Sequence, residues 1–417
     1  MEERSILTVD YLDKYLNARN RVVIYGAARY AKRLIDYIVS VNKEQKIEAV
    51  IVTQKEGTEC EYRGIQVQEA IPFLERNRNC CVLIAASLAF QDAISSIVEK
   101  YVHEYYYITD WLFFDMGKKL GIPYEEVDFI VAGCAKCGTT SLHRELTKIK
   151  DIYLSDIKES QIFAWYDRVK DPKKKLVEVF LNNIEEGQVV GMIEPSFFSE
   201  AEKVRDFFGN KVKLIFIVRN PVVAEFSKFK MMNRNGNAEL EEAYQRAGMF
   251  YPEMFDEFFE KDYTRDIYKY VLWIENFAKY YPKEQMKIVF FEDLINKPQT
   301  VVEDILDFIE VPCDYKIEKL PLENEGNFVM ADAEGYRLAK LLHNLEFEIL
   351  CLDYDDVDEK IKMRREYKEI MKRFNDAQKI TNLKMTENQK RKIETYYADS
   401  VRELEAITGR DLSTLWF

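Results

Sequence analysis

The sequence predicts an α/β fold in two domains, a small doubly wound domain followed by a larger domain with a central parallel sheet. Short apolar runs alternate with amphipathic helical patterns over roughly the first 100 residues, which is typical of a doubly wound sheet. A second series of such units begins at Asp128, where an apolar run enters a glycine-bounded loop. The polar segment 117–127 separates the two series. We therefore predict domains at 1–116 and 128–417, joined by a linker.

Four apolar runs in the first domain are predicted strands. They cover residues 21–25, 47–52, 81–86 and 105–108, and the predicted helices follow Gly26, lie near 70–74 and cover 90–102. This pattern resembles the Rossmann-like domains at the front of several bacterial sugar-modifying enzymes. Its dinucleotide signal is poor, because Ala28 and Ala31 stand where the fingerprint needs glycine, and Thr53 follows the second strand instead of an acidic residue. We expect a docking or scaffolding role, and a nucleotide or sugar-nucleotide site is the alternative.

The second domain opens with a predicted strand–loop–helix unit at residues 128–149. Residues 129–132 have the length and β-branched content of a buried parallel strand, and apolar residues recur at helical spacing after the loop. The backbone turns between Gly133 and Gly138, and the following helix directs its unpaired N–H groups into the loop. Three hydroxyl groups join them, those of Thr139, Thr140 and Ser141. This arrangement suits a phosphate or sulfate, and an ordinary buried turn is the alternative.

The loop differs from the nucleotide-triphosphate loop GxxxxGK[ST]. Gly133 and Gly138 have the right separation, but Thr139 follows the second glycine and the lysine, Lys136, lies inside the loop. A lysine at that position approaches the anion from a different side. This weakens the interpretation as an ATP or GTP site.

Two of the seven cysteines, Cys134 and Cys137, form a CxxC within this loop. An odd and scattered set of cysteines makes no secreted disulfide framework. A redox or zinc half-site is one interpretation of the CxxC, but there is no second CxxC and the three histidines show no ligand pattern. We expect both cysteines to pack the loop, and we predict no metal.

Composition predicts a soluble, cytoplasmic protein. The 417 residues include 60 basic and 73 acidic side chains, and the net charge of −13 argues against general binding to nucleic acids or anionic membranes. No apolar run approaches membrane-spanning length, and the first 20 residues are charged and amphipathic. An anionic small molecule would therefore need a locally positive pocket. Homo-oligomerisation stays open.

A second strand–helix unit ends its strand in an arginine. Residues 213–219 read KLIFIVR, and Pro221 suits the first turn of the helix that follows. Arg219 therefore points into the crevice at the carboxyl ends of the strands, where α/β sheets bind ligands. Its planar guanidinium suits a phosphate, and Ser227 lies about two turns along the helix. A salt bridge to a carboxylate is the alternative for Arg219.

A lysine and a glutamate, Lys158 and Glu159, follow the apolar residues 152–154 and precede an aromatic segment. They are either a surface ion pair of little energetic weight or a general base with its neighbour in an aromatic pocket. Spacing alone leaves both interpretations open.

Together the two units resemble the PAPS-dependent sulfotransferases, in which PAPS is 3′-phosphoadenosine 5′-phosphosulfate. The first family signature, PKxGTTxL, is matched by AKCGTTSL at residues 135–142. The second, RxP followed by a serine, is matched by Arg219, Pro221 and Ser227. The resemblance covers roughly 128–417, and the heparan-type and bacterial carbohydrate sulfotransferases look most similar.

The resemblance implies sulfuryl transfer from PAPS to a hydroxyl of a carbohydrate, a cell-surface polysaccharide or its precursor, without a metal. The implied ligands of the 5′-phosphosulfate are Lys136, Cys137, Gly138, Thr139, Thr140 and Ser141. Arg219 and Ser227 would bind the 3′-phosphate. Lys158 and Glu159 fall on the lysine–glutamate pair of the heparan-type enzymes, whose glutamate deprotonates the acceptor, so Glu159 is the implied base.

The sequence also departs from the heparan type. Those enzymes carry a lysine where this chain has Ile193, so either Lys158 supplies that charge or the acceptor differs, and Glu194 becomes a second candidate base. Residues 331–380 are longer than usual for the family and highly charged, and we expect a helical insertion there. Two other functions remain open, a P-loop kinase or phosphotransferase and a catalytically silent nucleotide-binding module.

Overall fold

The computed structural model describes most of the chain as two compact units. The described residues are 5–6, 8–55, 60–86, 88–108, 112, 116, 119–120, 127–155, 157–169, 171–181, 184–185, 187–312, 315–317, 320, 328–352 and 356–417. The first unit comprises Met1–Glu125, Asp171–Glu186 and Asp353–Val357, and the second comprises Glu126–Lys170, Gly187–Leu352 and Asp358–Phe417. Most of the predicted linker 117–127 lies outside the described residues, so the predicted domain boundaries stay predictions.

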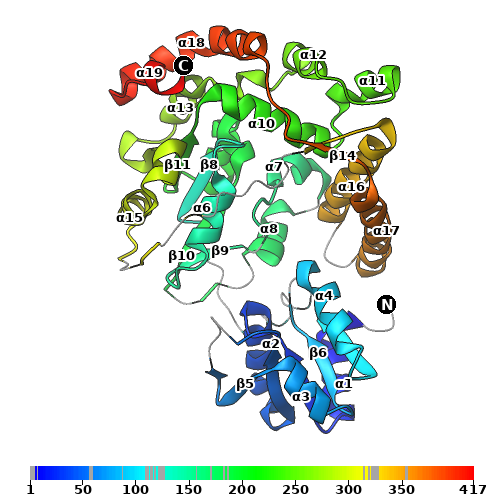
Figure 1. Ribbon diagram of the computed structural model, residues 1–417. Helices are drawn as coiled ribbons and strands as arrows, with labels where there is room; N and C mark the ends of the chain where they lie inside the picture. Colours follow the sequence, from blue (N-terminus) through cyan, green and yellow to red (C-terminus); the bar gives the residue numbers. More distant parts are fainter. Residues whose placement is uncertain are drawn as a thin grey trace. The chain divides into compact units, whose positions relative to one another are not determined.

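The first unit contains a seven-stranded sheet in the order β1-β7-β6-β2-β3-β5-β4. It is drawn in blue and cyan in Figure 1, where β5 and β6 are labelled. The strands are β1 (Ser5–Ile6), β2 (Val22–Tyr25), β3 (Ile47–Val52), β4 (Glu61–Tyr62), β5 (Ile65–Glu69), β6 (Cys81–Ile84) and β7 (Glu104–Ile108). All pair in parallel except β4 with β5. Val22 and Ile24 belong to one apolar core, whereas Val23 and Tyr25 belong to another. Since successive strand residues face opposite sides, the sheet is covered on both faces, and the predicted doubly wound fold is confirmed.

The helices of the first unit differ in detail from the sequence-based expectation. They are α1 (Val9–Ala18), α2 (Arg29–Ser40), the 3₁₀ turn η2 (Glu44–Lys46), α3 (Ala70–Arg76), α4 (Leu88–Val98) and α8 (Pro172–Phe180). The predicted helix at 90–102 ends at Val98. Gly26, at the end of β2, has a φ of +125°, and a Cβ there would lie 2.5 Å from the Ala85 carbonyl oxygen. Close approach of β2 to β6 therefore accounts for this glycine without a ligand.

The second unit is built on a five-stranded parallel sheet in the order β12-β11-β8-β10-β9 (Figure 1). Its strands are β8 (Phe129–Gly133), β9 (Ile152–Leu154), β10 (Val189–Ile193), β11 (Lys213–Val218) and β12 (Met286–Phe290). β8 lies between β10 and β11 and is buried along its whole length. The carboxyl ends of these three strands therefore meet at one edge, which is where such sheets bind ligands.

Helices surround this sheet. They are α6 (Thr139–Leu146), α7 (Ile162–Trp165), α9 (Ala201–Phe208), α10 (Pro221–Arg234), α11 (Ala238–Ala247), α12 (Met254–Lys261), α13 (Tyr270–Ala278), α14 (Phe291–Asn296), α15 (Pro298–Phe308), α18 (Glu387–Thr408) and α19 (Ser413–Trp416), with 3₁₀ turns η3 (Tyr166–Arg168), η4 (Pro195–Ser199), η5 (Arg265–Tyr268) and η6 (Lys283–Gln285). α18 begins with a capping box between Thr386 and Gln389.

The described part of residues 331–380, the predicted insertion, is largely helical. It contains α16 (Ala333–Cys351) and α17 (Val357–Asp376), which the Tyr367 hydroxyl and the Glu346 carboxylate join by a hydrogen bond of 2.6 Å. Two short strands flank these helices in the sequence, β13 (Phe328–Met330) before them and β14 (Lys379–Thr381) after them. The two strands pair with each other in antiparallel fashion. The two ends of the helical segment therefore lie side by side.

Candidate active site

The loop after β8 has the backbone shape of an anion-binding turn. Gly138 has a φ of +91°, in the left-handed region that favours glycine, and a Cβ there would lie 2.7 Å from the Phe291 side chain. α6 begins directly after it, at Thr139, and no side chain caps its N-terminus. The first N–H groups of α6 and the positive end of its dipole therefore face the loop, where they can bind a phosphate or sulfate.

Two carbonyl groups of this loop accept hydrogen bonds from residues outside it. Arg219 Nη1 donates to the Lys136 carbonyl oxygen at 2.8 Å, and the Tyr268 hydroxyl donates to the Ala135 carbonyl oxygen at 3.2 Å. Lys136 has a φ of +65°, a backbone conformation that costs a non-glycine residue about 1–3 kcal/mol. The two hydrogen bonds help to hold the loop in that shape.

The Lys136 ammonium group lies close to other cations. Its pKa is lowered to about 8, first by burial and then by the positive charges of Arg234, Lys158 and Arg219. An anion bound among these groups would offset their mutual repulsion. The loop is therefore suited to a ligand that carries several negative charges.

Arg219 follows β11 directly, and its guanidinium is held on two sides. Besides its hydrogen bond to the loop, it lies 4.1 Å from the centroid of the Phe291 ring, in a cation–π contact. The Tyr270 hydroxyl donates to the Arg219 carbonyl oxygen at 2.6 Å. The Asn220 side chain caps α10, and Pro221 occupies its first turn, as the sequence predicts.

A cavity of about 650 Å³ joins these two strand ends. Its lining includes nine residues that the sequence selects, namely Lys136, Gly138, Thr139, Thr140, Ser141, Lys158, Glu159, Arg219 and Ser227. The other lining residues are Ala135, Pro195, Ser196, Val223, Phe226, Lys230, Met231, Arg234, Phe291 and Met385. The chain therefore collects the loop, the arginine end of β11 and the lysine–glutamate pair around one space.

Lys158 and Glu159 form an ion pair with each other at the wall of this cavity. Their side chains are 21% and 38% exposed, so the Glu159 carboxylate is accessible to a bound molecule. Ser160, the next residue, is fully buried. The pair thus lies at the edge of the core, facing the site.

Glu194, the second candidate base, does not line the cavity. Its side chain is fully buried, and its Oε1 accepts a hydrogen bond from the Ser160 N–H at 2.5 Å. Burial raises its pKa to about 8. The structure therefore places Glu194 behind the segment that carries Glu159.

Cys137, included among the expected donor ligands, also does not line the cavity. Its thiol is buried, 3.6 Å from the Ala135 carbonyl oxygen and 3.8 Å from the Tyr270 hydroxyl. Cys134 is fully buried as well, which raises the pKa of its thiol, and its Sγ donates to the Ile267 carbonyl oxygen. Both thiols are free and pack the rear of the loop. Within the described part of the chain, no group of three or more His, Cys, Asp or Glu side chains is arranged to hold a metal ion.

Two cationic residues that line the cavity were not predicted from the sequence. Lys230 and Arg234 line the cavity from α10. They follow Ser227 by three and seven residues, a spacing that places all three on one helical face. This spacing is the signal that could have found them. Met385 had no such signal, because it reaches the cavity from beyond the insertion.

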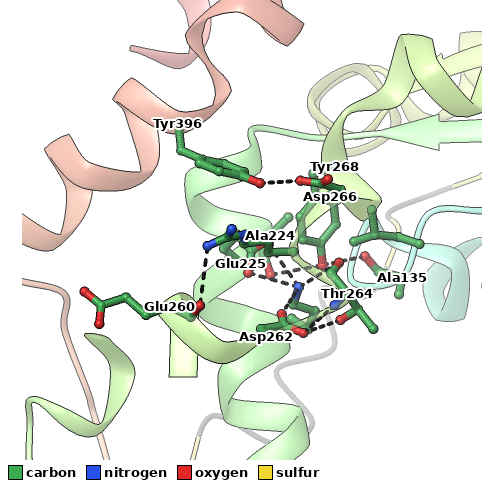
Figure 2. Close-up of polar contacts among 12 residues, drawn as sticks. Ala135, Ala224, Glu225, Glu260, Asp262, Thr264, Asp266, Tyr268 and Tyr396 are labelled. Carbon is green, nitrogen blue, oxygen red and sulfur yellow. Dashed lines mark hydrogen bonds and ion pairs between the residues drawn. The ribbon is translucent and has the colours of Figure 1, made fainter. Parts of the chain in front are cut away.

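A buried ionic cluster involves residues of α10 that do not line the cavity, and Figure 2 shows the polar contacts of this region. Lys228 Nζ lies 3.1 Å from Glu225 Oε2 and 2.5 Å from Asp262 Oδ2. The Tyr397 hydroxyl, from α18, donates to Glu225 Oε1 at 2.5 Å. Tyr268 connects this region to the loop, because its hydroxyl is within hydrogen-bonding distance of the Ala135 carbonyl oxygen. The cluster therefore supports α10 and the anion loop from behind.

The fold is α/β, and the cavity at the adjacent strand ends is lined by five cationic side chains and one carboxylate. The sulfotransferase domain family matches residues 126–405, and the chain belongs to that family. It is a PAPS-dependent sulfotransferase, as the two motifs predict, and this decides against the kinase and the silent module. None of the helices in the described part of the chain combines the length and apolarity that crossing a membrane requires.

Several solved structures are similar to the chain. A crystal structure of a sulfotransferase from Alicyclobacillus acidocaldarius has 19% identity and a TM-score of 0.44, with 70% of this chain and 98% of that chain covered. The sulfotransferase domain of the Synechococcus PCC 7002 olefin synthase has 15% identity and a TM-score of 0.28, covering 48% and 81%. The sulfotransferase domain from the curacin biosynthetic pathway has 12% identity and a TM-score of 0.31, covering 66% and 99%. No curated protein matches the chain.

Proposed function

We propose that this enzyme transfers the sulfuryl group of PAPS to a hydroxyl of a carbohydrate, a cell-surface polysaccharide or its precursor, in the cytoplasm and without a metal. One observation carries the proposal: a single cavity is lined by the anion loop, by Arg219 with Ser227, and by the Lys158–Glu159 pair. The carbohydrate acceptor is supported by the likeness of that pair to the lysine–glutamate pair of heparan-type enzymes.

The donor is proposed to span the two strand ends. The N–H groups of the loop and of the first turn of α6, with Lys136, bind the 5′-phosphosulfate. Arg219 and Ser227 bind the 3′-phosphate, which ATP lacks. Cys137 contributes no side-chain contact in this arrangement, because its thiol faces the core.

Transfer is proposed to run in line, through a loose transition state that resembles that of phosphoryl transfer. The acceptor oxygen forms a bond to sulfur while the bond from sulfur to the bridging oxygen of the donor breaks, and that oxygen leaves with the electron pair on 3′-phosphoadenosine 5′-phosphate (PAP). Glu159 takes the hydroxyl proton, and Lys136 stabilises the charge on the bridging oxygen. Glu194 is set back from the cavity and holds the backbone of Ser160, so we assign the base to Glu159.

Calorimetric titration tests the donor, and labelled transfer tests the acceptor. PAP should bind the full chain tightly without magnesium, and ATP should bind far more weakly, because it lacks the 3′-phosphate. Incubation with ³⁵S-labelled PAPS and carbohydrate fractions from the native cell should label a polysaccharide or its precursor. Equal affinity for ATP and PAP would contradict the donor assignment, and label found only in lipid or protein would contradict the carbohydrate acceptor.

A further inference from the structure

The segment that carries the proposed base is held by a buried carboxyl group, that of Glu194. Glu194 directly follows β10, and its side chain is fully buried. Its Oε1 accepts a hydrogen bond of 2.5 Å from the Ser160 N–H. That N–H belongs to the peptide group that joins Glu159 to Ser160. Glu194 therefore holds the backbone that carries the Glu159 side chain, although it does not itself line the cavity.

Side chains also fix the rest of the turn after Glu159. Glu159 and Ser160 lie outside any strand or helix. Trp165 Nε1 donates to the Ser160 carbonyl oxygen at 2.7 Å, and the Ile162 N–H donates to Ser160 Oγ at 3.3 Å. Gln161 has a φ of +52°, a conformation that a non-glycine residue keeps only when its surroundings hold it there. The position of this turn therefore depends on tertiary contacts of this kind.

The contact of the Glu159 carboxylate with Lys158 cannot fix its distance from the donor. Lys158 is the preceding residue of the same segment, so the ion pair moves with the segment. The Glu159 side chain is also 38% exposed, which leaves it little support from packing. Where the carboxylate lies relative to the anion loop therefore depends on what holds the backbone of Glu159 and Ser160.

Glu194 links that backbone to the strand that leads into the anion loop. Its own N–H donates to the Val131 carbonyl oxygen at 2.9 Å, and Ile193, the last residue of β10, pairs with Val131 of β8. Val131 lies two residues before Gly133, where the anion loop begins. One residue thus bonds to β8 through its backbone and to Ser160 through its side chain.

We propose that Glu194 is a positioning residue, which fixes the distance between the Glu159 carboxylate and a sulfuryl group bound at the anion loop by holding the Ser160 N–H. This inference rests on the proposed function, in which Glu159 is the base. It gives Glu194 a role in the rate of transfer without contact with donor or acceptor. Such a role can be large, because a displacement of about 1 Å in a reacting group can cost about 100-fold in rate.

The proposed role needs an acceptor oxygen at the right distance and does not need a charge. Burial raises the pKa of Glu194 to about 8, so near pH 7 the group is mostly neutral and still accepts through its carbonyl oxygen. Glutamine keeps such an oxygen at the same distance but cannot take up a proton. Aspartate can take up a proton, but its oxygens are withdrawn by one methylene. Positioning therefore predicts that Glu194→Gln is more active than Glu194→Asp, whereas a base at Glu194 predicts the reverse order.

Labelled transfer and hydrogen exchange on the full chain test this order. With ³⁵S-labelled PAPS and a saturating amount of the carbohydrate fraction of the native cell, Glu194→Asp should lower the rate about tenfold or more. Glu194→Gln should keep at least about a third of the parent rate, and both variants should bind PAP within about twofold of the parent affinity in calorimetry. Backbone exchange in a peptide covering residues 157–163 should become faster in Glu194→Asp and stay close to the parent rate in Glu194→Gln.

A double-variant cycle separates positioning from general damage. If Glu194 acts through Glu159, Glu194→Asp should cause little further loss of rate in a chain that already carries Glu159→Gln. Glu200→Asp is the control, because the Glu200 side chain is 33% exposed, pairs with Lys203 and lies outside the cavity lining. It should behave as the parent chain does in all three measurements.

Several outcomes overturn the proposal. It is wrong if Glu194→Gln loses about tenfold or more of the rate, a result that decides the matter even if Glu194→Asp does not fold. It is also wrong if Glu194→Asp keeps the parent rate, or if its loss is undiminished in the Glu159→Gln background. Failure of the proposed function is a different result, namely a parent chain that does not bind PAP or a Glu159→Gln variant with full turnover.

Discussion

Replacing Lys228 with methionine should destabilise the second unit strongly. The Lys228 side chain is 5% exposed and lies between Glu225 and Asp262, whose side chains are completely buried. Methionine keeps the length of the side chain and removes its charge, so two buried carboxylates lose their counterion. Breaking a buried ion pair in this way costs about 3–5 kcal/mol. We expect a loss of that size in the free energy of unfolding near neutral pH.

Urea titration with pulsed hydrogen exchange measures this loss locally, in peptides from α10 and α12. Lys390→Met is the matched control, because Lys390 is 41% exposed and pairs with Glu387 on the surface of α18. It should change stability by less than about 0.5 kcal/mol. If Lys228→Met falls within about 1 kcal/mol of this control, the buried cluster does not stabilise α10 as argued.

The dependence on pH gives a second check on the same variant. Burial raises the pKa of Glu225 from 4.5 to about 7, and the charge of Lys228 opposes that rise. A raised folded-state pKa means that the folded state holds the proton more firmly, so this group's contribution is complete below about pH 4.5 and is lost as the pH rises through 7. Without Lys228 the pKa should rise further. The defect of Lys228→Met should therefore be smaller at pH 6 than at pH 8, and a defect independent of pH would contradict the argument.

Three further predictions concern the proposed reaction. Lys136→Ala should lower transfer from labelled PAPS by about 100-fold or more. The affinity of the parent chain for PAP should fall above pH 8, because the Lys136 ammonium of the unliganded chain loses its proton there. A PAP affinity that stays constant between pH 7 and 9 would exclude Lys136 as a donor ligand. Arg219→Ala should weaken the binding of PAP at least about tenfold. It should weaken adenosine 5′-phosphosulfate, which lacks the 3′-phosphate, much less, because Arg219 meets that end only through its hydrogen bond to the loop. Equal losses of affinity in calorimetry would show that Arg219 does not bind the 3′-phosphate. Glu159→Gln should lower kcat about 100-fold or more without changing the affinity for PAP. If this variant keeps its turnover, Glu159 is not the base.

The central part of both sheets was predictable because its signals are local. Buried parallel strands read as short apolar runs, and the strand ends carry the glycine loop and Arg219 within the same few residues. The edge strands β1 and β4 have two residues each, too few to show a period, and were not predicted. The ends of helices could not be predicted to the residue, because fraying and tertiary contacts decide where a helix ends.

Site residues could be predicted where they lie together on one helix or loop. They could not be predicted where tertiary packing decides whether a side chain faces the cavity. Ser227, Lys230 and Arg234 share a helical face, so knowing that Ser227 points at the cavity fixes the other two. Whether Glu194 faces the cavity or the core depends on how the end of β10 packs, which its sequence does not state. Met385 arrives through a pairing of β13 with β14, strands that the whole insertion separates.

The hydrogen bonds that the loop carbonyl groups accept help to explain how this loop can bind an anion. Carbonyl oxygens that faced the cavity would repel a phosphosulfate, yet the Ala135 and Lys136 carbonyls accept hydrogen bonds from Tyr268 and Arg219. Tyr268 lies beside the Lys228 cluster, 5.3 Å from the Lys228 ammonium to the ring centroid. The ionic cluster behind α10 and the anion loop in front of it are therefore connected through one tyrosine. Since Arg219 bonds to the loop as well, the distance between the two proposed ends of the donor is set by the protein before any donor binds.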